Sequence, residues 1–322
     1  MFFVSADEID RALAYPALID AIDRQFAAGI RAPTRHHHTM TRSHGADGTL
    51  LLMPAWSDFE TIGPNEQSFL GVKIVTVNPD NNALNRPAVM GTYLLSDGKT
   101  GETLAILDGQ ALTARRTAAA SALASRYLSR PDASSLTMIG AGALAPQLIR
   151  AHAAVRPIRK VSIWNRNRDK AQAVVALFAD DPFDIRVADD REAAVRGADI
   201  VSAATISDVP LIEGDWLRQG THVDLVGAFT PRLRESDDAA VRRATLFVDT
   251  FDGALSEGGD LVQPLQAGVI TREDVKADLA MLARGQHPGR RGEDEITLFK
   301  STGTALEDFA AGVLVYRTLR GI

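Results

Sequence analysis

The pattern of hydrophobic and polar residues changes along the chain, and its first part predicts two short helices. Ser5 and Glu8 have the spacing of a capping box, in which each side chain caps the other residue's backbone amide. A second helix is predicted from Pro16, a residue favoured in a first turn, to near Gly29. Its apolar face consists of Leu18, Ile19, Ile22 and Phe26.

Residues 33–107 show a different pattern, in which short β-rich runs are separated by Gly, Pro, Asn and Asp. This pattern is typical of an antiparallel sheet with little helix. The predicted strands are Leu50–Met53, Leu70–Val77, Gly91–Leu95 and Leu104–Leu107. An alanine-rich stretch follows, and we predict that Thr113–Leu128 is helical.

From Ser135 onward, short apolar runs alternate with helical stretches, which predicts βαβ units and a doubly wound parallel sheet. The predicted strands are Leu136–Ile139, Val161–Trp164, Ile185–Val187, Ile200–Ala203, Val223–Val226, Leu246–Val248 and Ile296–Phe299. The predicted helices are Ala143–Val155, Arg168–Phe178 and Thr304–Leu319. We therefore expect an α/β domain at 114–303, inserted between a β-rich segment at 1–113 and a helix at 304–322 that returns to it.

Composition and charge narrow the possible functions. A chain of 322 residues is long enough for two domains. The net charge of −6 argues against a nucleic-acid or anionic-membrane surface, because both need clustered Lys and Arg. The absence of cysteine excludes disulfides, thiolate metal sites and a thiol nucleophile. No apolar run is long enough to span a membrane, and the N-terminus lacks the basic region of a secretory signal, so we expect a cytoplasmic protein.

A glycine turn, Gly140-Ala-Gly-Ala-Leu-Ala145, directly follows a predicted strand and opens a predicted helix. In the pattern G-x-G-x-x-A, the first glycine allows the tight turn and the second lets the backbone approach a pyrophosphate. The alternative is a turn with a purely structural role. The strand, the helix and the following βαβ units favour a dinucleotide site.

The end of the next strand bears on the choice of cofactor. Proteins that bind NAD place an acidic residue there, whereas Val161–Trp164 is followed by Asn165, Arg166 and Asn167. Arg166 would attract the 2′-phosphate of NADP, although a solvated loop arginine is the alternative interpretation. We therefore predict NADPH as the preferred cofactor, with NADH as a possible second one.

Three basic residues are candidates for binding an anion. Lys73 alternates with apolar residues on one strand face, so it is either an edge residue reaching solvent or a buried functional ammonium. Arg116 lies among alanines and could bind a carboxylate, or it could belong to a surface pair with Arg115. Arg35 is equally ambiguous. The run His36–His38 has no carboxylate at ligand spacing, so we predict no metal site.

Several separated motifs together resemble the ornithine cyclodeaminase/mu-crystallin family over essentially the whole chain. They are Met53-Pro54, Lys73–Thr76, Leu107–Ala119, Gly140–Gly142, Val226–Pro231, Phe299–Gly303 and Glu307-Asp308. The resemblance implies a Rossmann-type domain inserted into a smaller α+β domain for substrate binding and dimerisation. It also implies a homodimer joined through the N-terminal sheets.

The resemblance further assigns roles by position. It implies that Arg35, Lys73 and Arg116 bind the substrate carboxylate and that Met53 lines the pocket. Cofactor contacts are implied at Thr117, Gly140, Ala141, Gly142, Ala143, Leu144, Asn165, Arg166, Asn167, Ala204, Thr205, Val226, Gly227, Ser301 and Gly303. Ser301–Gly303 would lie near the nicotinamide.

One departure from the family pattern bears on the reaction. Cyclodeaminases carry an aspartate where this chain has Phe229, and Asp224 lies too far inside its strand to replace it. The Gly-Ala-Phe-Thr version resembles members that reduce the cyclic ketimines Δ1-pyrroline-2-carboxylate and Δ1-piperideine-2-carboxylate to proline and pipecolate. A protonated C=N bond is already electrophilic, so such a reductase needs an anion site and a hydride donor rather than a strong base.

The resemblance thus leads to a specific hypothesis. Arg116 with Arg35 would hold the carboxylate, Lys73 would orient it and supply or retain the imine proton, and Phe229 with Met53 would form an apolar wall. NADPH would deliver hydride across the cleft between the domains. Ammonia release would instead indicate an NAD-dependent cyclodeaminase or an alanine-type dehydrogenase. A failure to turn over NADPH with a ketimine would indicate a ligand-binding protein like mu-crystallin.

Overall fold

The computed structural model describes residues 1–63, 66–84 and 86–322, and the chain divides into two compact units. Unit 1 combines Met1–Thr117 with Thr304–Ile322, so it is built from both ends of the chain. Unit 2 is the continuous middle segment, Ala118–Gly303. The first division falls inside one long helix, α3 (Gly109–Leu128).

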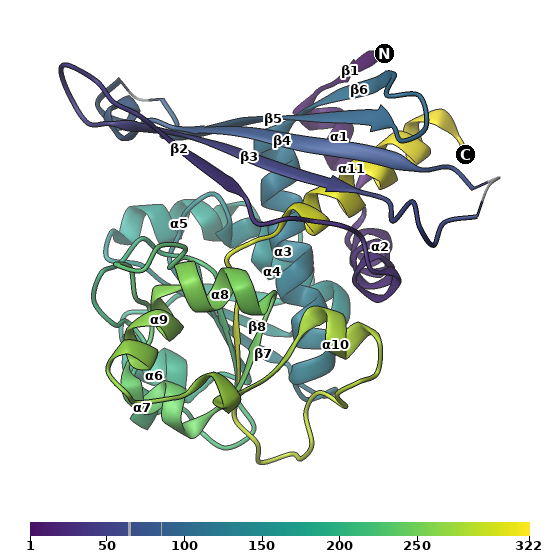
Figure 1. The fold of residues 1–322 in the computed structure, drawn as a ribbon. Coiled ribbons are helices and arrows are strands. Elements are labelled where there is room, and N and C mark those ends of the chain that lie inside the picture. Colours follow the sequence, from purple (N-terminus) through teal and green to yellow (C-terminus); the bar gives the residue numbers. More distant parts are fainter. Residues whose placement is uncertain (64–65, 85) are drawn as a thin grey trace. The chain divides into compact units, whose positions relative to one another are not determined.

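Unit 1 is built on a six-stranded sheet in the order β1-β6-β5-β4-β3-β2 (Figure 1). Its strands are β1 (Phe2–Val4), β2 (His36–Met40), β3 (Gly48–Trp56), β4 (Phe69–Val77), β5 (Val89–Asp97) and β6 (Thr103–Asp108). Neighbouring strands are antiparallel, as predicted, except that β1 pairs with β6 in parallel. Neither β1 nor β2 was among the predicted strands.

The helices of unit 1 are α1 (Ala6–Ala12), α2 (Tyr15–Ala28), the first part of α3 and α11 (Ala305–Arg320), with a short 3₁₀ turn, η1, at Pro79–Leu84. The capping box of Ser5 and Glu8 is present, and α2 ends at Gly29 in the left-handed conformation. These two predictions are confirmed. Helix α11 contacts α2 and the strand β4.

A buried tyrosine shows how tightly α11 fits the sheet. Tyr93 on β5 is fully buried. A Cβ atom at Gly71 on β4 would lie 1.8 Å from the Tyr93 hydroxyl, and one at Gly312 on α11 would lie 2.4 Å from its ring. Both glycines are therefore needed for the ring to fit between strand and helix, since real Cβ contacts are never this short.

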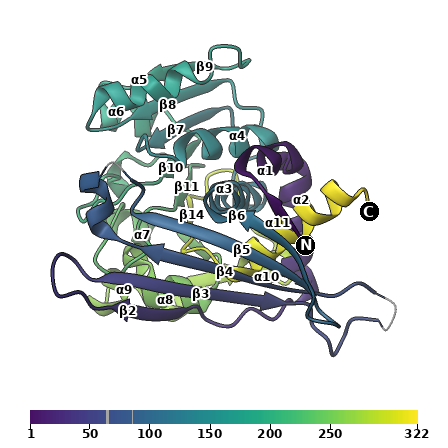
Figure 2. The same ribbon diagram turned by 90° about the horizontal axis from the view of Figure 1, so that it is seen from above.

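Unit 2 is built on an eight-stranded sheet in the order β13-β12-β14-β11-β10-β7-β8-β9, with every pair parallel. Figure 2 shows its strands from β14 to β9 in this order. Its strands are β7 (Ser135–Ile139), β8 (Lys160–Trp164), β9 (Asp184–Val187), β10 (Ile200–Ala203), β11 (His222–Leu225), β12 (Thr245–Val248), β13 (Val275–Asp278) and β14 (Thr297–Lys300). The order reverses between β7 and β10, which is the topological switch point of a Rossmann-type fold. The predicted fold class is confirmed.

Short helices connect these strands. They are α4 (Ala145–Val155), α5 (Arg168–Ala176), α6 (Arg191–Arg196), α7 (Asp238–Arg243), α8 (Phe251–Glu257), α9 (Gly259–Gln266) and α10 (Leu279–Ala283), with 3₁₀ turns η2 (Gly214–Trp216) and η3 (Arg272–Asp274). Within the described ranges, none of the helices combines the length and apolar character needed to cross a membrane.

Two predicted helix starts were wrong. Helix α3 begins at Gly109 rather than Thr113, because the Asp108 side chain accepts hydrogen bonds from the amides of Gln110 and Ala111 and starts the helix earlier. Helix α4 begins at Ala145 rather than Ala143, since the preceding residues form the glycine turn.

Candidate functional site

In unit 1, the middle of β4 carries a buried lysine. Lys73 is 1% exposed, and the backbone of Lys73 lies directly opposite that of Met53 on β3. Residues that face each other across antiparallel strands point to the same side of the sheet, so both side chains leave the same face. Lys73 is therefore a buried ammonium and not an edge residue reaching solvent.

The first turn of α11 supplies the acidic partners of this lysine. The Lys73 Nζ donates to Asp308 at 2.8 Å and to the Thr113 hydroxyl at 3.3 Å. Arg116 on α3 pairs with Glu307 and places its Nε 2.9 Å from Asp308. Both carboxylates are fully buried. Lys73, Arg116, Glu307 and Asp308 are called the unit 1 cluster below.

Electrostatics make the lysine an easily deprotonated ammonium. Burial, together with the charge of Arg116, lowers the pKa of Lys73 to about 8, although Asp308 opposes the shift. The charge of Arg35 also acts to lower the pKa, so Arg35, which directly precedes β2, lies within electrostatic range. The structure thus brings Met53, Lys73 and Arg116 together, and Arg35 acts on Lys73 through its charge.

The neighbouring arginine has a different environment. The Nε of Arg115 lies 2.7 Å from Asp10 of α1, and the guanidinium also donates to the carbonyl of Leu13. Arg115 therefore ties α3 to the N-terminal helices, while Arg116 points to the buried carboxylates. The sequence reasoning gave Glu307 and Asp308 no role. Two acidic residues in a helix's first turn ordinarily indicate only a favourable interaction with the helix dipole.

In unit 2, the glycine turn joins β7 to α4 at the switch point. Gly140 has a φ of 106°, and a Cβ there would lie 2.9 Å from the carbonyl oxygen of Ala204. Beside Gly142, by contrast, a Cβ would meet no atom within 4 Å. The first glycine therefore makes the turn possible, and the second leaves its backbone open to a pyrophosphate. These features fit the predicted dinucleotide.

The other predicted cofactor residues of unit 2 also follow the carboxyl ends of parallel strands, where ligands bind in such sheets. Asn165–Asn167 follow β8, Ala204 and Thr205 follow β10, Val226 and Gly227 follow β11, and Ser301–Gly303 follow β14. In the sheet, β8 and β10 lie on either side of β7, and β11 and β14 follow beyond β10. Thr117 lies in the part of α3 that belongs to unit 1.

The turn after β8 presents an arginine to solvent. Asn167 caps α5 by accepting from the amide of Lys170, and the side chain of Asn165 donates to the carbonyl of Asn167. Arg166, between them, is exposed. The turn is thus held by its two asparagines, and the arginine side chain is accessible to a ligand.

Two buried carboxylates that sequence reasoning missed hold these loops. Asp249, which follows β12, accepts from the amides of Thr302 and Gly303 at 2.7 Å and from the Ser301 hydroxyl at 3.1 Å. Glu235 accepts from the loops after β10 and β11. Burial and the charge of Asp260 raise the pKa of Glu235 to about 7. No sequence signal distinguishes such residues from surface acids.

Phe229 stands where cyclodeaminases have an aspartate, and Asp224 is the nearest acidic residue before it in the sequence. The two side chains lie in different environments. Asp224 on β11 is fully buried and accepts from the Ser202 hydroxyl at 2.7 Å, with His152 at 3.2 Å. It therefore belongs to the interior of unit 2, in line with the expectation that it does not replace the missing aspartate. Phe229 is 43% exposed. Its contact with a substrate ring stays a prediction.

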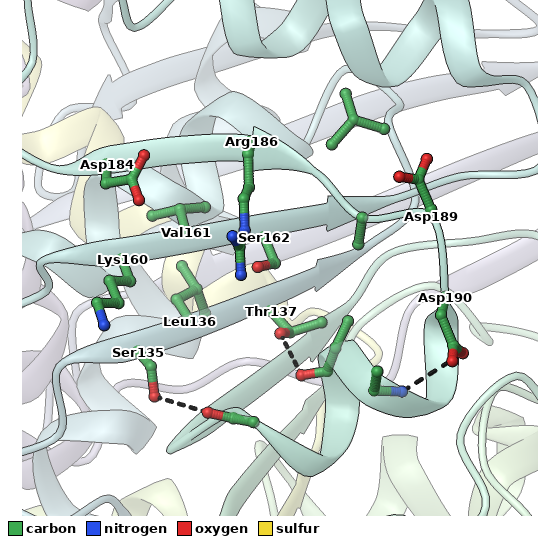
Figure 3. A pocket seen from close by; sticks show the side chains of 15 residues that line it. Ser135, Leu136, Thr137, Lys160, Val161, Ser162, Asp184, Arg186, Asp189 and Asp190 are labelled. Atoms are coloured by element: carbon green, nitrogen blue, oxygen red, sulfur yellow. Dashed lines mark hydrogen bonds between the residues drawn. The ribbon is translucent and has the colours of Figure 1, made fainter.

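Unit 2 also has a hollow of about 390 Å³ over β7, β8 and β9 (Figure 3). The hydroxyls of Ser135 and Thr137 there donate to the carbonyls of Gly197 and Ala194. None of the predicted cofactor residues lines it. These two hydroxyls fasten α6 and the residue after it to β7, and the glycine turn stays the predicted cofactor site.

The run His36–His38 forms most of the edge strand β2. All three histidines are exposed, and the rings of His36 and His38 lie 6.4 Å apart. Across the described part of the chain, no group of three or more His, Cys, Asp or Glu residues is placed to hold a metal ion.

Comparison with known proteins places this geometry in context. The model of the ornithine cyclodeaminase/mu-crystallin family matches residues 2–321. Δ1-pyrroline-2-carboxylate reductase of Paracoccus denitrificans is 39% identical, over 89% of this chain and 91% of its own length. Ketimine reductase mu-crystallin of Rattus norvegicus is 32% identical, over 98% of this chain and 96% of its own.

A solved structure is similar to this chain over its whole length. It is the Δ1-pyrroline-2-carboxylate reductase of Thermococcus litoralis in complex with NADH and L-proline. The two chains are 32% identical with a TM-score of 0.91, and the match covers 100% of this chain and 98% of the other.

Proposed function

Because the chain belongs to the ornithine cyclodeaminase/mu-crystallin family, we propose that it reduces a cyclic ketimine carboxylate with a nicotinamide cofactor, preferably NADPH. The substrate is Δ1-pyrroline-2-carboxylate or its six-membered homologue, and the product is L-proline or L-pipecolate. The observation that carries the proposal is the unit 1 cluster, in which a buried lysine and a buried arginine converge on Asp308.

The positive groups of unit 1 suit a small carboxylate. Arg116 offers a planar guanidinium, which binds carboxylates in a fixed orientation. Glu307 and Asp308 hold that guanidinium in place, so little side-chain entropy is lost when the substrate binds. Arg35 supplies a further positive charge. Met53, on the same sheet face as Lys73, contributes an apolar surface for the ring.

Lys73 is suited to donate a proton to the imine nitrogen or to keep that nitrogen protonated. Its pKa of about 8 leaves it mostly protonated at neutral pH while still able to release a proton. Asp308 and the Thr113 hydroxyl orient its ammonium. The protonated C=N carbon is then electrophilic enough to accept hydride, and the ring nitrogen keeps the proton in the amine product.

Unit 2 supplies the groups that fit the cofactor. The open backbone at Gly142 suits the pyrophosphate, and Arg166 suits a 2′-phosphate. When bound, the reduced nicotinamide supplies the hydride. The turn after β8 contains no acid that would repel the extra phosphate, which supports NADPH over NADH.

We also propose a homodimer joined through the sheets of unit 1. Large apolar side chains are exposed on one face of two neighbouring strands, namely Ile74 on β4 and Met90 on β5. Exposed apolar groups of this kind favour a protein interface. Light scattering after size exclusion would give twice the chain mass of 34.6 kDa for the dimer. A single chain mass at micromolar concentration would contradict it.

The test of the proposed function measures two reactions of the purified protein. Oxidation of NADPH and NADH is followed with five- and six-membered ketimine acids, and ammonia is assayed with ornithine. We expect ketimine-dependent oxidation of the cofactor and no ammonia. The chain has Phe229 where cyclodeaminases have an aspartate, so it offers no carboxylate there to take a proton from a bound amine. Catalytic ammonia release would indicate a cyclodeaminase instead. Binding of NADPH without any turnover would indicate a ligand-binding protein.

The variant Phe229→Asp introduces the carboxylate that cyclodeaminases have at this position, and so tests whether residue 229 decides between ketimine reduction and amine oxidation. An added charge at an apolar wall should weaken ketimine reduction, and it should admit at most slight amine oxidation. Ketimine reduction that is unchanged in Phe229→Asp would show that this residue does not contact the ring.

A further inference from the structure

Glu235 makes an unusual set of contacts for a fully buried carboxylate. One oxygen, Oε1, accepts from the Thr205 amide at 2.6 Å and the Thr205 hydroxyl at 2.9 Å. The other, Oε2, accepts from the amides of Gly227 at 2.7 Å and Ala228 at 3.3 Å. The two oxygens therefore bind two separate loops, which follow the neighbouring strands β10 and β11.

The loops joined in this way also contact the glycine turn. A Cβ on Gly140 would lie 2.9 Å from the Ala204 carbonyl oxygen and 3.0 Å from the Thr205 methyl. A Cβ on Gly227 would lie 2.0 Å from the Thr205 carbonyl oxygen and 2.6 Å from Glu235 Oε1. Because these groups are closely packed, a displacement of the Thr205 loop would also displace the glycine turn that we propose binds the pyrophosphate.

The backbone around Glu235 is itself fixed. Asp260 on α9 accepts from the amides of Glu235 at 2.7 Å and Ser236 at 2.9 Å. The Asp260 carboxylate lies 3.1 Å from the Nζ of Lys300 on β14, which also donates to the carbonyl of Leu225. All three charged side chains are fully buried. Glu235, Asp260 and Lys300 are called the unit 2 cluster below.

We propose that Glu235 is a positioning residue for the dinucleotide, holding the loops after β10 and β11 in the conformation that binds the cofactor. The inference rests on the proposed function only in taking these loops as the cofactor site. An amide in place of the carboxylate would present NH₂ hydrogens to backbone N–H groups on one of the two loops, and that loop would lose its acceptor. The loss should therefore appear as weaker cofactor binding.

The chain offers a matched control at the other end of the same sheet. Asp199 accepts from the amides of Ser134 at 2.9 Å and Ser135 at 3.0 Å, and it pairs with Arg130 and Arg218. It thus joins the amino ends of β7 and β10, as Glu235 joins the carboxyl ends of β10 and β11. Asp199→Asn removes a comparable carboxylate without touching the cofactor loops.

The experiment titrates NADPH and NADH into the full-length protein and follows their fluorescence, with the melting temperature measured in parallel. Glu235→Gln should raise the cofactor Kd by about tenfold or more, whereas Asp199→Asn should lower the melting temperature and leave Kd within about twofold. An unchanged Kd in Glu235→Gln, or an equal rise in both variants, would overturn the proposal.

Two further variants decide the question if Glu235→Gln does not fold, a mild one, Thr205→Val, and a more severe one, Gly227→Ala, whose Cβ would lie 2.0 Å from the Thr205 carbonyl oxygen. Gly227→Ala places a methyl group against Thr205 and Glu235, and Thr205→Val removes one of the four hydrogen bonds. Both should weaken cofactor binding, Gly227→Ala more strongly, and normal affinity in both would overturn the proposal. Because these titrations contain no ketimine, wild-type protein that binds NADPH but reduces no ketimine would refute the proposed function alone.

Discussion

The two units each bury a cluster of charges, but they use them in different ways. In the unit 1 cluster, side chains pair with side chains, two cations with two carboxylates, and Arg35 lies within electrostatic range of Lys73. The unit 2 cluster holds two carboxylates against one ammonium. Its carboxylates accept mostly from backbone amides.

The difference shows how buried charge can serve two purposes. Backbone amides compensate the extra negative charge of the unit 2 cluster, so it needs no ligand and determines the shape of loops. The cations of the unit 1 cluster are held by side chains, and we propose that they also bind an added anion, such as a substrate carboxylate. On this view, variants of the first cluster change substrate turnover, and variants of the second change cofactor affinity.

The largest effect is expected from removing a cation of the unit 1 cluster. Lys73→Met and Arg116→Met should each lower kcat/KM for the ketimine by about 2–4 kcal/mol, or roughly 30- to 1,000-fold. Arg115→Met is the control, because Arg115 pairs with Asp10 instead. Steady-state kinetics with melting temperatures distinguish lost function from lost fold. Equal losses in Arg115→Met and Arg116→Met would refute the assignment.

A smaller effect is expected from substitutions in the turn after β8. They should change the preference between NADPH and NADH rather than the rate of ketimine reduction. NADPH should be preferred over NADH by at least about tenfold, and Arg166→Asp should erode or invert the preference. Arg168→Asp makes the same charge change two residues away, at an arginine that already pairs with Asp189. If the wild-type protein used both cofactors equally, or if Arg168→Asp had the same effect, Arg166 would lose its proposed role.

The smallest expected effect is a displacement of the pH profile. Since Lys73 has a pKa of about 8, kcat/KM for reduction should fall as pH rises above that value and the ammonium loses its proton. Asp308 favours the charged form, so Asp308→Asn should move this alkaline limb to lower pH. Glu307→Gln alters the partner of Arg116 and should leave the limb in place. An unmoved limb in Asp308→Asn would show that another group titrates.

Sequence reasoning worked where a local pattern determines the structure. Alternating apolar residues located β4 with Lys73 on its apolar face, and Gly140 and Gly142 located the turn at the switch point. Such patterns are local because strand alternation and backbone conformation depend on neighbouring residues. The family resemblance added the grouping of Arg35, Met53, Lys73 and Arg116.

The carboxylates could not be predicted in the same way. Asp308 reaches Lys73 across 235 positions of sequence, and Glu235 joins two loops that only the folded sheet brings together. Nothing in the composition around these residues distinguishes them from solvated surface acids, which are far more common. Their roles follow from tertiary packing.

The central claim is that the unit 1 cluster binds the carboxylate of a cyclic imine, and a cycle of two substrates and two proteins tests it directly. Δ1-pyrroline-2-carboxylate is compared with Δ1-pyrroline, which lacks the carboxylate, in the wild-type protein and in Arg116→Met. We expect loss of the carboxylate to lower kcat/KM by about 100-fold or more in the wild type but by less than about tenfold in Arg116→Met. Equal losses in both proteins would contradict it, because they would show that Arg116 does not interact with the carboxylate.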